Sequence, residues 1–396
     1  MWVAGGSSAV RVVFVSSIGL HGVGGSSDVQ RGIVERLVQR GHAVETITFR
    51  APGAPRGSAR SYREYTVPTL SIPGASSVLM ILAVLRRVIL QRPQLIISGV
   101  GYPTAVLVHA VSRLTRLPYA IFTFAEDVTC VGSDSRKARL LARALDAAQD
   151  ILTISQFTQA AIMRLGIPAE RISLTPPWVD GSAFVPVDEA RLATLRASLC
   201  LQHQRVVLTV ARLSRRKGHD TVLRAIGGLG ADFADVHYLV VGKGDPTELQ
   251  QLARACGMEE RLTIVEYVSA QDLPLYYHLC DVYAMVSRPD PDTGEVEGFG
   301  IVYLEAAAAG KPSVAGDAGG APDAVEHGKT GLVVDAHDPD ATRAALTQLL
   351  SNPETAQGMG RAAKIRAHDQ FTKEARLDAM EQALLGGERP TLPSSG

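Results

Sequence analysis

Residues 205–226 read RVVLTVARLSRRKGHDTVLRAI, and this stretch holds a strand pattern, a loop and the start of a helix in that order. The six residues RVVLTV form a mostly apolar run, which is typical of a strand that is covered on both faces. A helix pattern begins at Asp220, so the unit is strand, loop, helix. Repetition of such units along a chain predicts an α/β fold with a parallel sheet and helices on both sides.

The same alternation runs through both halves of the chain. In the first half the strand patterns are VRVVFVS, AVETITF, QLIIS, YAIFTF, DILTIS and ISLTP, and the helix patterns cover Asp28 to Arg40, a segment from Val78, Thr104 to Thr115 and a segment from Gln156. In the second half the strand patterns are RVVLTV, VHYLVVG, LTIVEYV, VYAMV, PSVAG and TGLVV, with helices from Asp220, near Thr247 to Cys256, ending at Cys280 and from Ile301. Three further helices are predicted at Asp338 to Leu350, Ala356 to His368 and Phe371 to Leu385.

A break separates the two halves. The segment PPWVDGSAFVPVDEA (residues 176–190) has three prolines and no periodicity, as expected of a boundary. We therefore predict two doubly wound, Rossmann-like domains, residues 1–180 and 181–368, that face each other across a cleft. Residues 369–396 are predicted as a C-terminal helix that packs back on the first domain and a mobile tail, RPTLPSSG. Ligands of such sheets bind outside the carboxyl ends of the strands, so the loops there are the candidate sites.

Composition narrows the class of protein. The 396 residues are too many for one ordinary core, and 46% hydrophobic with 20% charged residues indicates a folded, soluble protein. Lysine plus arginine equals aspartate plus glutamate at 40 each, which argues against nucleic acid as the main partner.

Cysteines and apolar runs suggest the compartment. The four cysteines form no C-x-x-C pair, which predicts reduced, buried thiols in a cytoplasmic protein: Cys130, Cys200, Cys256 and Cys280. The beginning of the sequence has no basic-then-apolar leader, so no signal peptide is expected. The apolar stretch from Val78 to Leu85, which resumes after Arg86 and Arg87, falls short of the roughly 20 residues of a membrane span. We interpret it as a buried helix that covers the sheet, the alternative being peripheral contact with an anionic membrane.

The first candidate loop is HGVGGSSDVQ, residues 21–30. Its glycines, Gly22, Gly24 and Gly25, allow the backbone to approach a ligand, and the helix that follows points its positive end there. The dinucleotide fingerprint G-x-G-x-x-G is broken at Ser27, and Arg50 stands where an acid would hold a ribose. A ligand loop and a plain glycine turn remain open, whereas a hydride-transferring dehydrogenase is disfavoured.

The second candidate loop is ARLSRRKGHD, residues 211–220. Arg212, Arg215, Arg216 and Lys217 crowd the carboxyl end of a strand, where basic side chains can bind phosphate oxygens. A solvated basic loop is the alternative.

The third candidate is EGFGIVYLE, residues 297–305. Its glycines permit close approach, and the amides of Gly300, Ile301 and Val302 would face an anion at the start of a helix. Glu305, one turn inside that helix, suits two hydroxyls of a ribose. Glu297, before the turn, suits hydroxyls of a second sugar and the positive charge that develops at its anomeric carbon.

These motifs together resemble a known family. RLSRRKG, joined to EGFGIVYLEAAAAGKPSVAGDAGGAPDAVEHGKTGLVV, is similar to the retaining nucleotide-sugar glycosyltransferases of family 4, whose fold is GT-B. The stretch EGFGIVYLEA is most similar to the branch of the family that includes the bacterial phosphatidylinositol mannosyltransferases. The family's Glu-seven-residues-Glu signature matches Glu297 and Glu305, and its phosphate-binding Arg and Lys match Arg212 and Lys217.

The resemblance also implies roles for other residues. The first domain is expected to bind the acceptor and the second the nucleotide sugar. Glu126 occupies the place of the family's sugar-proximal histidine, and Asp127 follows it; both are assigned to the catalytic group. The remaining donor-binding residues are expected in the glycine-rich loop, the VVGKGD loop, the base loop and the acid-flanked turn: Gly24, Gly25, Gly242, Tyr267, Val268 and Phe299. Glu266 stands at the base loop's usual glycine, and the nucleotide is left as GDP, UDP or ADP.

The resulting hypothesis is metal-independent transfer of a sugar, with retained configuration, to a hydroxyl or amine of a small molecule or lipid. No cofactor is expected, because the donor is a substrate and basic residues neutralise the diphosphate. Two further alternatives are a GT-B phosphorylase or epimerase and a nucleotide-sugar-binding protein with weak catalysis.

Overall fold

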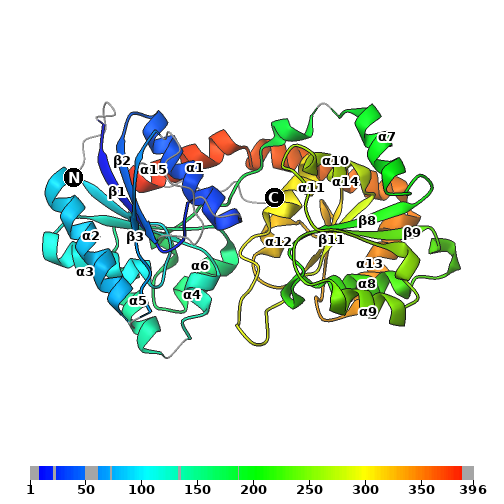
Figure 1. The fold of residues 1–396 in the computed structure, drawn as a ribbon, viewed down its shortest axis with the longest axis horizontal. Coiled ribbons are helices and arrows are strands. Elements are labelled where there is room, and N and C mark those ends of the chain that lie inside the picture. Colours follow the sequence, from blue (N-terminus) through cyan, green and yellow to red (C-terminus); the bar gives the residue numbers. More distant parts are fainter. Residues whose placement is uncertain are drawn as a thin grey trace. The chain divides into compact units, whose positions relative to one another are not determined.

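The computed structural model describes residues 9–20, 24–49, 61–71, 74–132, 135–185 and 187–385. The chain divides into two compact units (Figure 1). The N-terminal unit comprises Met1–Pro176 and Glu374–Gly396, and the C-terminal unit comprises Pro177–Lys373. These divisions fall a few residues from the boundaries that the sequence suggests. The predicted mobile tail lies outside the described residues.

The N-terminal unit has one parallel sheet of seven strands in the order β3-β2-β1-β4-β5-β6-β7. The strands are β1 (Arg11–Ser16), β2 (Ala43–Phe49), β3 (Arg63–Val67), β4 (Leu95–Ser98), β5 (Tyr119–Thr123), β6 (Asp150–Thr153) and β7 (Ile172–Leu174). The helices are α1 (Gly25–Gln39), α2 (Ala75–Gln91), α3 (Thr104–Thr115), α4 (Glu126–Thr129), α5 (Arg136–Ala147), α6 (Gln156–Met163), η1 (Ala169–Arg171) and α15 (Lys373–Leu385). Central strands such as β4 and β5 are buried along their whole length, because helices cover both faces of the sheet.

Strand β3 and helix α5 are the longest of the elements in this unit that the sequence does not predict. Strand β3 reads REYTV, and it lies at the edge of the sheet, where polar side chains meet solvent and leave no continuous apolar run. Helix α5 follows a Ser135 cap and buries Leu141 and Leu145 on one face, but its many arginines hide that stripe in the sequence.

Helix α2 differs from the buried helix that the sequence suggests. One side buries Met80 and Val84 against the sheet, but the opposite side exposes Val78, Leu82, Ile89 and Leu90, with Ile89 73% exposed. Arg87 does not reach solvent. Its guanidinium forms two hydrogen bonds of 2.7 and 2.8 Å with the carboxylate of Glu45 and lies 4.2 Å from the centre of the Tyr65 ring. No helix among the described residues is long and apolar enough to cross a membrane.

Helix α15 belongs to the N-terminal unit although the C-terminal unit precedes it in the chain. Charged contacts attach it to α1. Arg36 donates to Glu374 at 2.8 Å and to Asp378, and Arg40 donates to Asp378 at 2.7 Å. Burial alone would raise the pKa of Asp378, but the hydrogen bonds and charges of the two arginines bring it below the usual value.

The C-terminal unit has one parallel sheet of six strands in the order β10-β9-β8-β11-β12-β13. Its strands are β8 (Arg205–Val210), β9 (Val236–Val241), β10 (Leu262–Val265), β11 (Val282–Met285), β12 (Ser313–Gly316) and β13 (Gly331–Val334). Its helices are η2 (Gly181–Phe184), α7 (Glu189–Ser198), η3 (Arg215–Lys217), α8 (His219–Gly227), η4 (Ala231–Phe233), α9 (Thr247–Ala255), η5 (Glu259–Arg261), α10 (Leu273–Leu279), α11 (Ile301–Ala308), α12 (Ala321–Ala324), α13 (Pro339–Ser351) and α14 (Pro353–Gln370).

The strand order creates a switch point in each sheet. From β8 the chain moves outward to β9 and β10, whereas from β11 it moves the other way to β12 and β13. The loops after β8 and β11 therefore diverge and leave a crevice at the carboxyl edge between two adjacent strands. Strands β1 and β4 form the equivalent pair in the N-terminal sheet.

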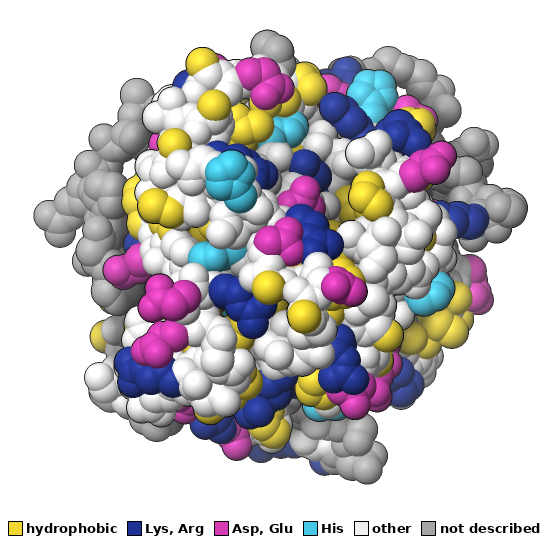
Figure 2. Space-filling view, turned by 90° about the vertical axis from the view of Figure 1, so that its right-hand side faces the viewer, with side chains coloured by type: hydrophobic (Ala, Val, Ile, Leu, Met, Phe, Trp, Pro, Cys, Tyr) yellow, Lys and Arg dark blue, Asp and Glu magenta, His cyan; other side chains and the backbone are white. Residues whose placement is uncertain are grey.

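Two surface properties bear on the composition arguments. Only Cys280 is buried; Cys256 is partly buried, and Cys130 and Cys200 are exposed, so the prediction that all four thiols are buried is wrong. All four are free. Acidic and basic side chains are interspersed across the face in Figure 2, in keeping with the equal numbers of the two kinds.

Candidate functional site

The switch point of the C-terminal sheet brings together two loops that are far apart in the sequence. The Lys217 ammonium, which follows β8, donates a hydrogen bond to the carboxylate of Glu297, which follows β11. Arg216 lies 3.4 Å from the same carboxylate oxygen. Gly218 makes this approach possible, because a Cβ there would lie 2.1 Å from the carbonyl oxygen of Val286. Separate partners, a phosphate and a sugar, are predicted for Lys217 and Glu297 from the sequence, whereas the structure pairs the two side chains.

The charges around Glu297 favour the ionised form of its carboxyl group. Its side chain is only 13% exposed, and this burial would raise its pKa. The charges of Lys217, Arg216 and Arg212 outweigh the burial and bring the pKa below the usual value. A lowered pKa in the folded state stabilises the fold above the unfolded-state pKa, and that contribution is lost as the pH falls through the folded-state value.

A glycine turn after β12 holds the backbone of Glu297. Gly320 donates its N–H to the carbonyl oxygen of Glu297 at 2.8 Å. Gly319 has a left-handed φ of +65°, and a Cβ on it would lie 2.3 Å from that same oxygen. The glycine pair of GDAGGAPD therefore positions the acid.

The predicted anion site is the turn of residues 298–300 before α11, named the open turn because the first amides of a helix have no partner within the helix. Gly300 precedes the helix with a φ of +89°, and a Cβ there would lie 2.5 Å from the Tyr303 ring. The first hydrogen bond of the helix joins the N–H of Tyr303 to the carbonyl of Gly300 at 3.0 Å. The amides of Gly300, Ile301 and Val302 precede it, so helix geometry leaves them available to a ligand.

Glu305 lies one turn further along α11 and is oriented by a buried tyrosine. The Tyr277 hydroxyl, from α10, donates a hydrogen bond to one carboxylate oxygen of Glu305. Burial raises the pKa of Tyr277 well above its usual value, and the nearby Glu305 charge raises it further, so the hydroxyl keeps its proton. A carboxylate has acceptor capacity left after one such bond, which suits a ribose diol.

The four basic residues of the second candidate loop do not act as one group. Arg212 is exposed and contributes to lowering the pKa of Glu297. Arg215 lies 3.1 Å from Glu248 of α9, away from Glu297. Arg216 is buried and also lies 3.8 Å from Glu295.

The residues predicted to contact the nucleotide lie in the loops after β9 and β10. Tyr267 is 70% exposed, and the ammonium of Lys243 lies 5.3 Å from the centre of its ring. Val268 follows and is partly buried. Gly242 packs the β9 loop onto the β8 loop, because a Cβ there would lie 1.8 Å from the carbonyl oxygen of Ala211.

Phe299, one of the predicted donor-binding residues, has its side chain in the core. Its side chain is buried, and its ring centre lies 5.8 Å from that of Phe371. The ring therefore belongs to the core under the turn, and contact with a donor is left to its backbone.

The N-terminal candidates lie at the carboxyl edge of their own sheet. Gly24 precedes α1 with a φ of 146°, and Gly25 is the first residue of that helix; Gly22 lies outside the described residues. Glu126 is exposed at the start of α4. The side chain of Asp127 instead binds backbone amides of two loops. One carboxylate oxygen accepts from the Gly101 N–H at 2.5 Å, and the other accepts from the Phe124 N–H at 2.8 Å.

The carboxyl group of Asp127 links two loops. Burial raises its pKa to about 8, against the lowering effect of the two amide donors. Its carboxyl group joins the loop after β4 to the loop after β5. These bonds hold the backbone at the start of α4, from which the side chain of Glu126 projects.

Several supporting residues could not be found by sequence reasoning. Nothing in the sequence distinguishes Arg216 from the other basic residues of its loop, and a tyrosine in an apolar helix such as Tyr277 has the pattern of a core residue. Gly319 and Gly320 stand out in the sequence only within the segment that resembles the family. Among the described residues there is no group of three or more His, Cys, Asp or Glu placed to hold a metal ion.

Comparison with known proteins agrees with this geometry. The two Rossmann-like domains, each with one parallel sheet, match the GT-B fold of known glycosyltransferases. Residues 24–178 match the family described as "Glycosyl transferase 4-like domain", and residues 194–366 match "Glycosyl transferases group 1". The chain belongs to glycosyltransferase family 4, as its motifs suggest.

Curated relatives include members of the predicted branch. A GDP-mannose-dependent alpha-(1-6)-phosphatidylinositol monomannoside mannosyltransferase of Mycolicibacterium smegmatis is 38% identical over 257 residues, covering 64% of this chain and 66% of that protein. A D-inositol 3-phosphate glycosyltransferase of Mycobacterium marinum is 34% identical over 251 residues, covering 61% of this chain and 48% of that protein. The matches thus span just under two thirds, or less, of the length of these relatives.

Solved structures support the fold. Anabaena Alr3699/HepE in complex with UDP and glucose superposes with a TM-score of 0.77 at 20% identity, covering 94% of this chain and 98% of that chain. At this identity the likeness concerns the fold alone.

Proposed function

We propose that this protein is a retaining, metal-independent glycosyltransferase that moves a sugar from a nucleoside diphosphate to an acceptor hydroxyl or amine. The observation that carries the proposal is the cluster of Lys217, Arg216 and Glu297 at the switch point, with Arg212 beside it and the open amides of α11 in the same loop as the acid. In this assignment the C-terminal unit binds the donor and the N-terminal unit the acceptor.

The charges of the cluster suit a departing diphosphate. Arg212, Arg216 and Lys217 face the carboxylates of Glu295 and Glu297, which leaves one net positive charge. An ammonium group has three donors, so Lys217 can hold Glu297 and still donate to phosphate oxygens. Fixed donors aimed at the charge that develops in the transition state are the main means of catalysis where no nucleophile is needed.

The chemical step follows from this arrangement. The bond between the anomeric carbon and the phosphate oxygen breaks, and its electron pair goes to the diphosphate. The acceptor oxygen attacks from the same face of the sugar, and its proton passes to the departing phosphate oxygen, so the configuration is retained. Glu297 stabilises the positive charge at the anomeric carbon, while Glu305 holds the ribose and does not take part in bond changes.

The acceptor class we place first is a lipid. Support comes from the exposed apolar side of α2, where Val78, Leu82, Ile89 and Leu90 line one side of a helix in the proposed acceptor unit. The relatives named as phosphatidylinositol mannosyltransferases point the same way and make GDP-mannose the first donor to test. A soluble acceptor stays the second candidate.

A screen of donors and acceptors tests the function. We expect one nucleotide sugar among GDP-, UDP- and ADP-linked donors to raise the melting temperature of the protein. That donor, incubated with phosphatidylinositol vesicles or with soluble inositol and natural-product acceptors, should yield a product heavier by one sugar in mass spectrometry. Donor binding with no transfer to either acceptor class would favour a binding protein instead, and dependence on free phosphate would favour a phosphorylase.

Activity should survive excess chelator. Asp290 and Asp292 have the spacing of a metal-binding pair, but the Asp290 carboxylate accepts the N–H groups of Asp292 at 3.0 Å and of Thr293 at 2.9 Å, which fixes it in a turn. Basic side chains are expected to neutralise the diphosphate in place of a metal. Initial rates with EDTA, compared with calcium-loaded EDTA, check this. Loss of activity that magnesium or manganese restores would contradict the metal-independent mechanism.

A further inference from the structure

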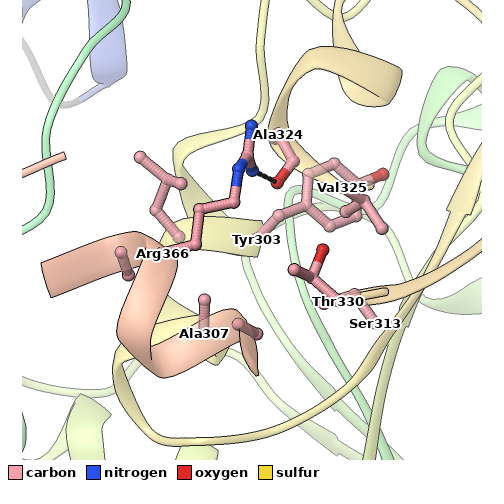
Figure 3. A pocket seen from close by; sticks show the side chains of 10 residues that line it. Tyr303, Ala307, Ser313, Ala324, Val325, Thr330 and Arg366 are labelled. Carbon is pink, nitrogen blue, oxygen red and sulfur yellow. Dashed lines mark hydrogen bonds between the residues drawn. The ribbon is translucent and has the colours of Figure 1, made fainter. Parts of the chain in front are cut away.

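A partly buried arginine, Arg366, contacts two elements of the C-terminal unit that adjoin the Glu297 segment. Arg366, on α14, donates hydrogen bonds to two successive carbonyl oxygens at the end of α12, Ala324 at 2.7 Å and Asp323 at 2.9 Å. Figure 3 shows its side chain reaching across a small pocket to Ala324. Its Nε lies 2.8 Å from the carboxylate of Glu326, and its guanidinium carbon lies 4.8 Å from the centre of the Phe371 ring.

The same short helix meets Glu297 at its other end. Helix α12 begins directly after Gly320, whose N–H donates to the Glu297 carbonyl at 2.8 Å. Hydrogen bonds from Asp323 to Gly320 (3.1 Å) and from Val325 to Ala321 (3.1 Å) link the two ends of the helix. Four helical residues therefore form a strut between Arg366 and the backbone of the acid.

A second path runs through aromatic rings. Phe371, under the guanidinium, packs with its ring centre 5.8 Å from that of Phe299. Phe299 lies two residues after Glu297 and immediately before the open turn. Both paths from Arg366 therefore end on the segment that carries Glu297.

We propose that Arg366 is a positioning residue for Glu297, acting through α12 and Phe371, and that it sets the rate of sugar transfer without contacting the donor. This inference rests on the proposed function, in which Glu297 serves the transferred sugar. The requirement is geometric, because a planar guanidinium can donate to two carbonyls at once whereas an ammonium group acts as a point charge. Arg366→Lys therefore keeps the positive charge but loses the planar pair of N–H donors that binds the two carbonyls.

The structure offers a matched control in the same unit. Arg205, at the amino end of β8, also donates to a backbone carbonyl, Asp232 at 2.6 Å, and pairs with a carboxylate, Asp235. Its guanidinium carbon lies 4.9 Å from the centre of the Phe233 ring. Arg205 thus reproduces the contacts of Arg366 at the opposite end of the strands from Glu297.

The test compares Arg366→Lys with Arg205→Lys. We expect Arg366→Lys to lower kcat by about ten- to one-hundred-fold, as small misplacements of a catalytic group do. Its affinity for the nucleoside diphosphate, measured by calorimetry, should fall much less than kcat, because Glu305 and Tyr277, which hold the ribose in the proposed function, lie on neither path. Arg205→Lys should keep both values, whatever its melting temperature.

A second readout does not need activity. Hydrogen exchange of the Gly320 amide should become faster in Arg366→Lys and stay unchanged in Arg205→Lys, since only the first variant loosens the strut. Equal losses of kcat in both variants, or unchanged Gly320 exchange in Arg366→Lys, would overturn the inference. Absence of transfer by the wild-type protein with every donor would instead count against the proposed function, and the exchange experiment would still decide the role of Arg366.

Discussion

Arg212→Ala should lower turnover by about 30- to 1,000-fold, which corresponds to about 2–4 kcal/mol, the usual cost of removing one donor from a developing negative charge. Arg212 is exposed, so its loss should leave the melting temperature nearly unchanged. Its charge acts on the region of Glu297 and the open turn, where the diphosphate is proposed to lie. Initial rates beside thermal unfolding curves measure both quantities.

Arg215→Ala is the control for this prediction. Arg215 lies in the same loop and is also exposed, but its side chain pairs with Glu248 of α9 instead of facing Glu297. Turnover should therefore stay near wild type. Equal losses in Arg212→Ala and Arg215→Ala would show that only the general charge of the loop matters, and wild-type turnover in Arg212→Ala would refute its assignment to the diphosphate.

Lys217→Ala also removes a positive charge from the proposed diphosphate site, but it affects the stability of the fold as well. Its removal leaves the buried Glu297 carboxylate without its closest cation, and truncating one partner of a buried pair destabilises the fold. We therefore expect both turnover and the melting temperature to fall.

Glu297→Gln and Glu305→Gln should fail in different ways. Glu305→Gln should weaken binding of the bare nucleoside diphosphate, because an amide is a poorer acceptor for the ribose hydroxyls. Glu297→Gln should leave that binding nearly intact and slow transfer, because a negative charge near the anomeric carbon is lost. Calorimetry with the nucleoside diphosphate, beside initial rates, separates the two effects.

Tyr277→Phe adds a matched variant on the ribose side. It removes the hydroxyl that orients Glu305 and keeps the ring in the core, so it should share the direction of the Glu305→Gln defect with a smaller size. The assigned roles would be wrong if Glu297→Gln lost nucleotide affinity as severely as Glu305→Gln.

The fold could be predicted because most of its strands are short, continuous runs of apolar residues in the sequence. Strands β8 and β9 are buried nearly throughout, and burial on both faces leaves a pattern that can be read without any neighbour. Edge strand β3 has no such pattern, because solvent accepts its polar side chains. Whether one of these three strands could be predicted therefore depended on whether both of its faces are buried.

The candidate site could be predicted as loops but not as contacts. The sequence marks the residues after β8 and β11 as polar and glycine-rich, yet Lys217 and Glu297 are 80 positions apart. Only the order of strands makes these loops neighbours, and a sequence pattern does not state that order. The Arg366 contacts were missed for the same reason, since an arginine within a helix looks like a solvated residue until its partners are known.

The late position of α15 in the chain has a consequence for synthesis. The ribosome completes the sheet of the N-terminal unit early, but Lys373–Leu385 emerges only after the whole C-terminal unit has been made. Until then Arg36 and Arg40 of α1 await their acidic partners, Glu374 and Asp378. The nascent N-terminal unit is thus held incomplete while its neighbour is translated, and a gene cut after residue 176 would encode a half that never receives its last helix.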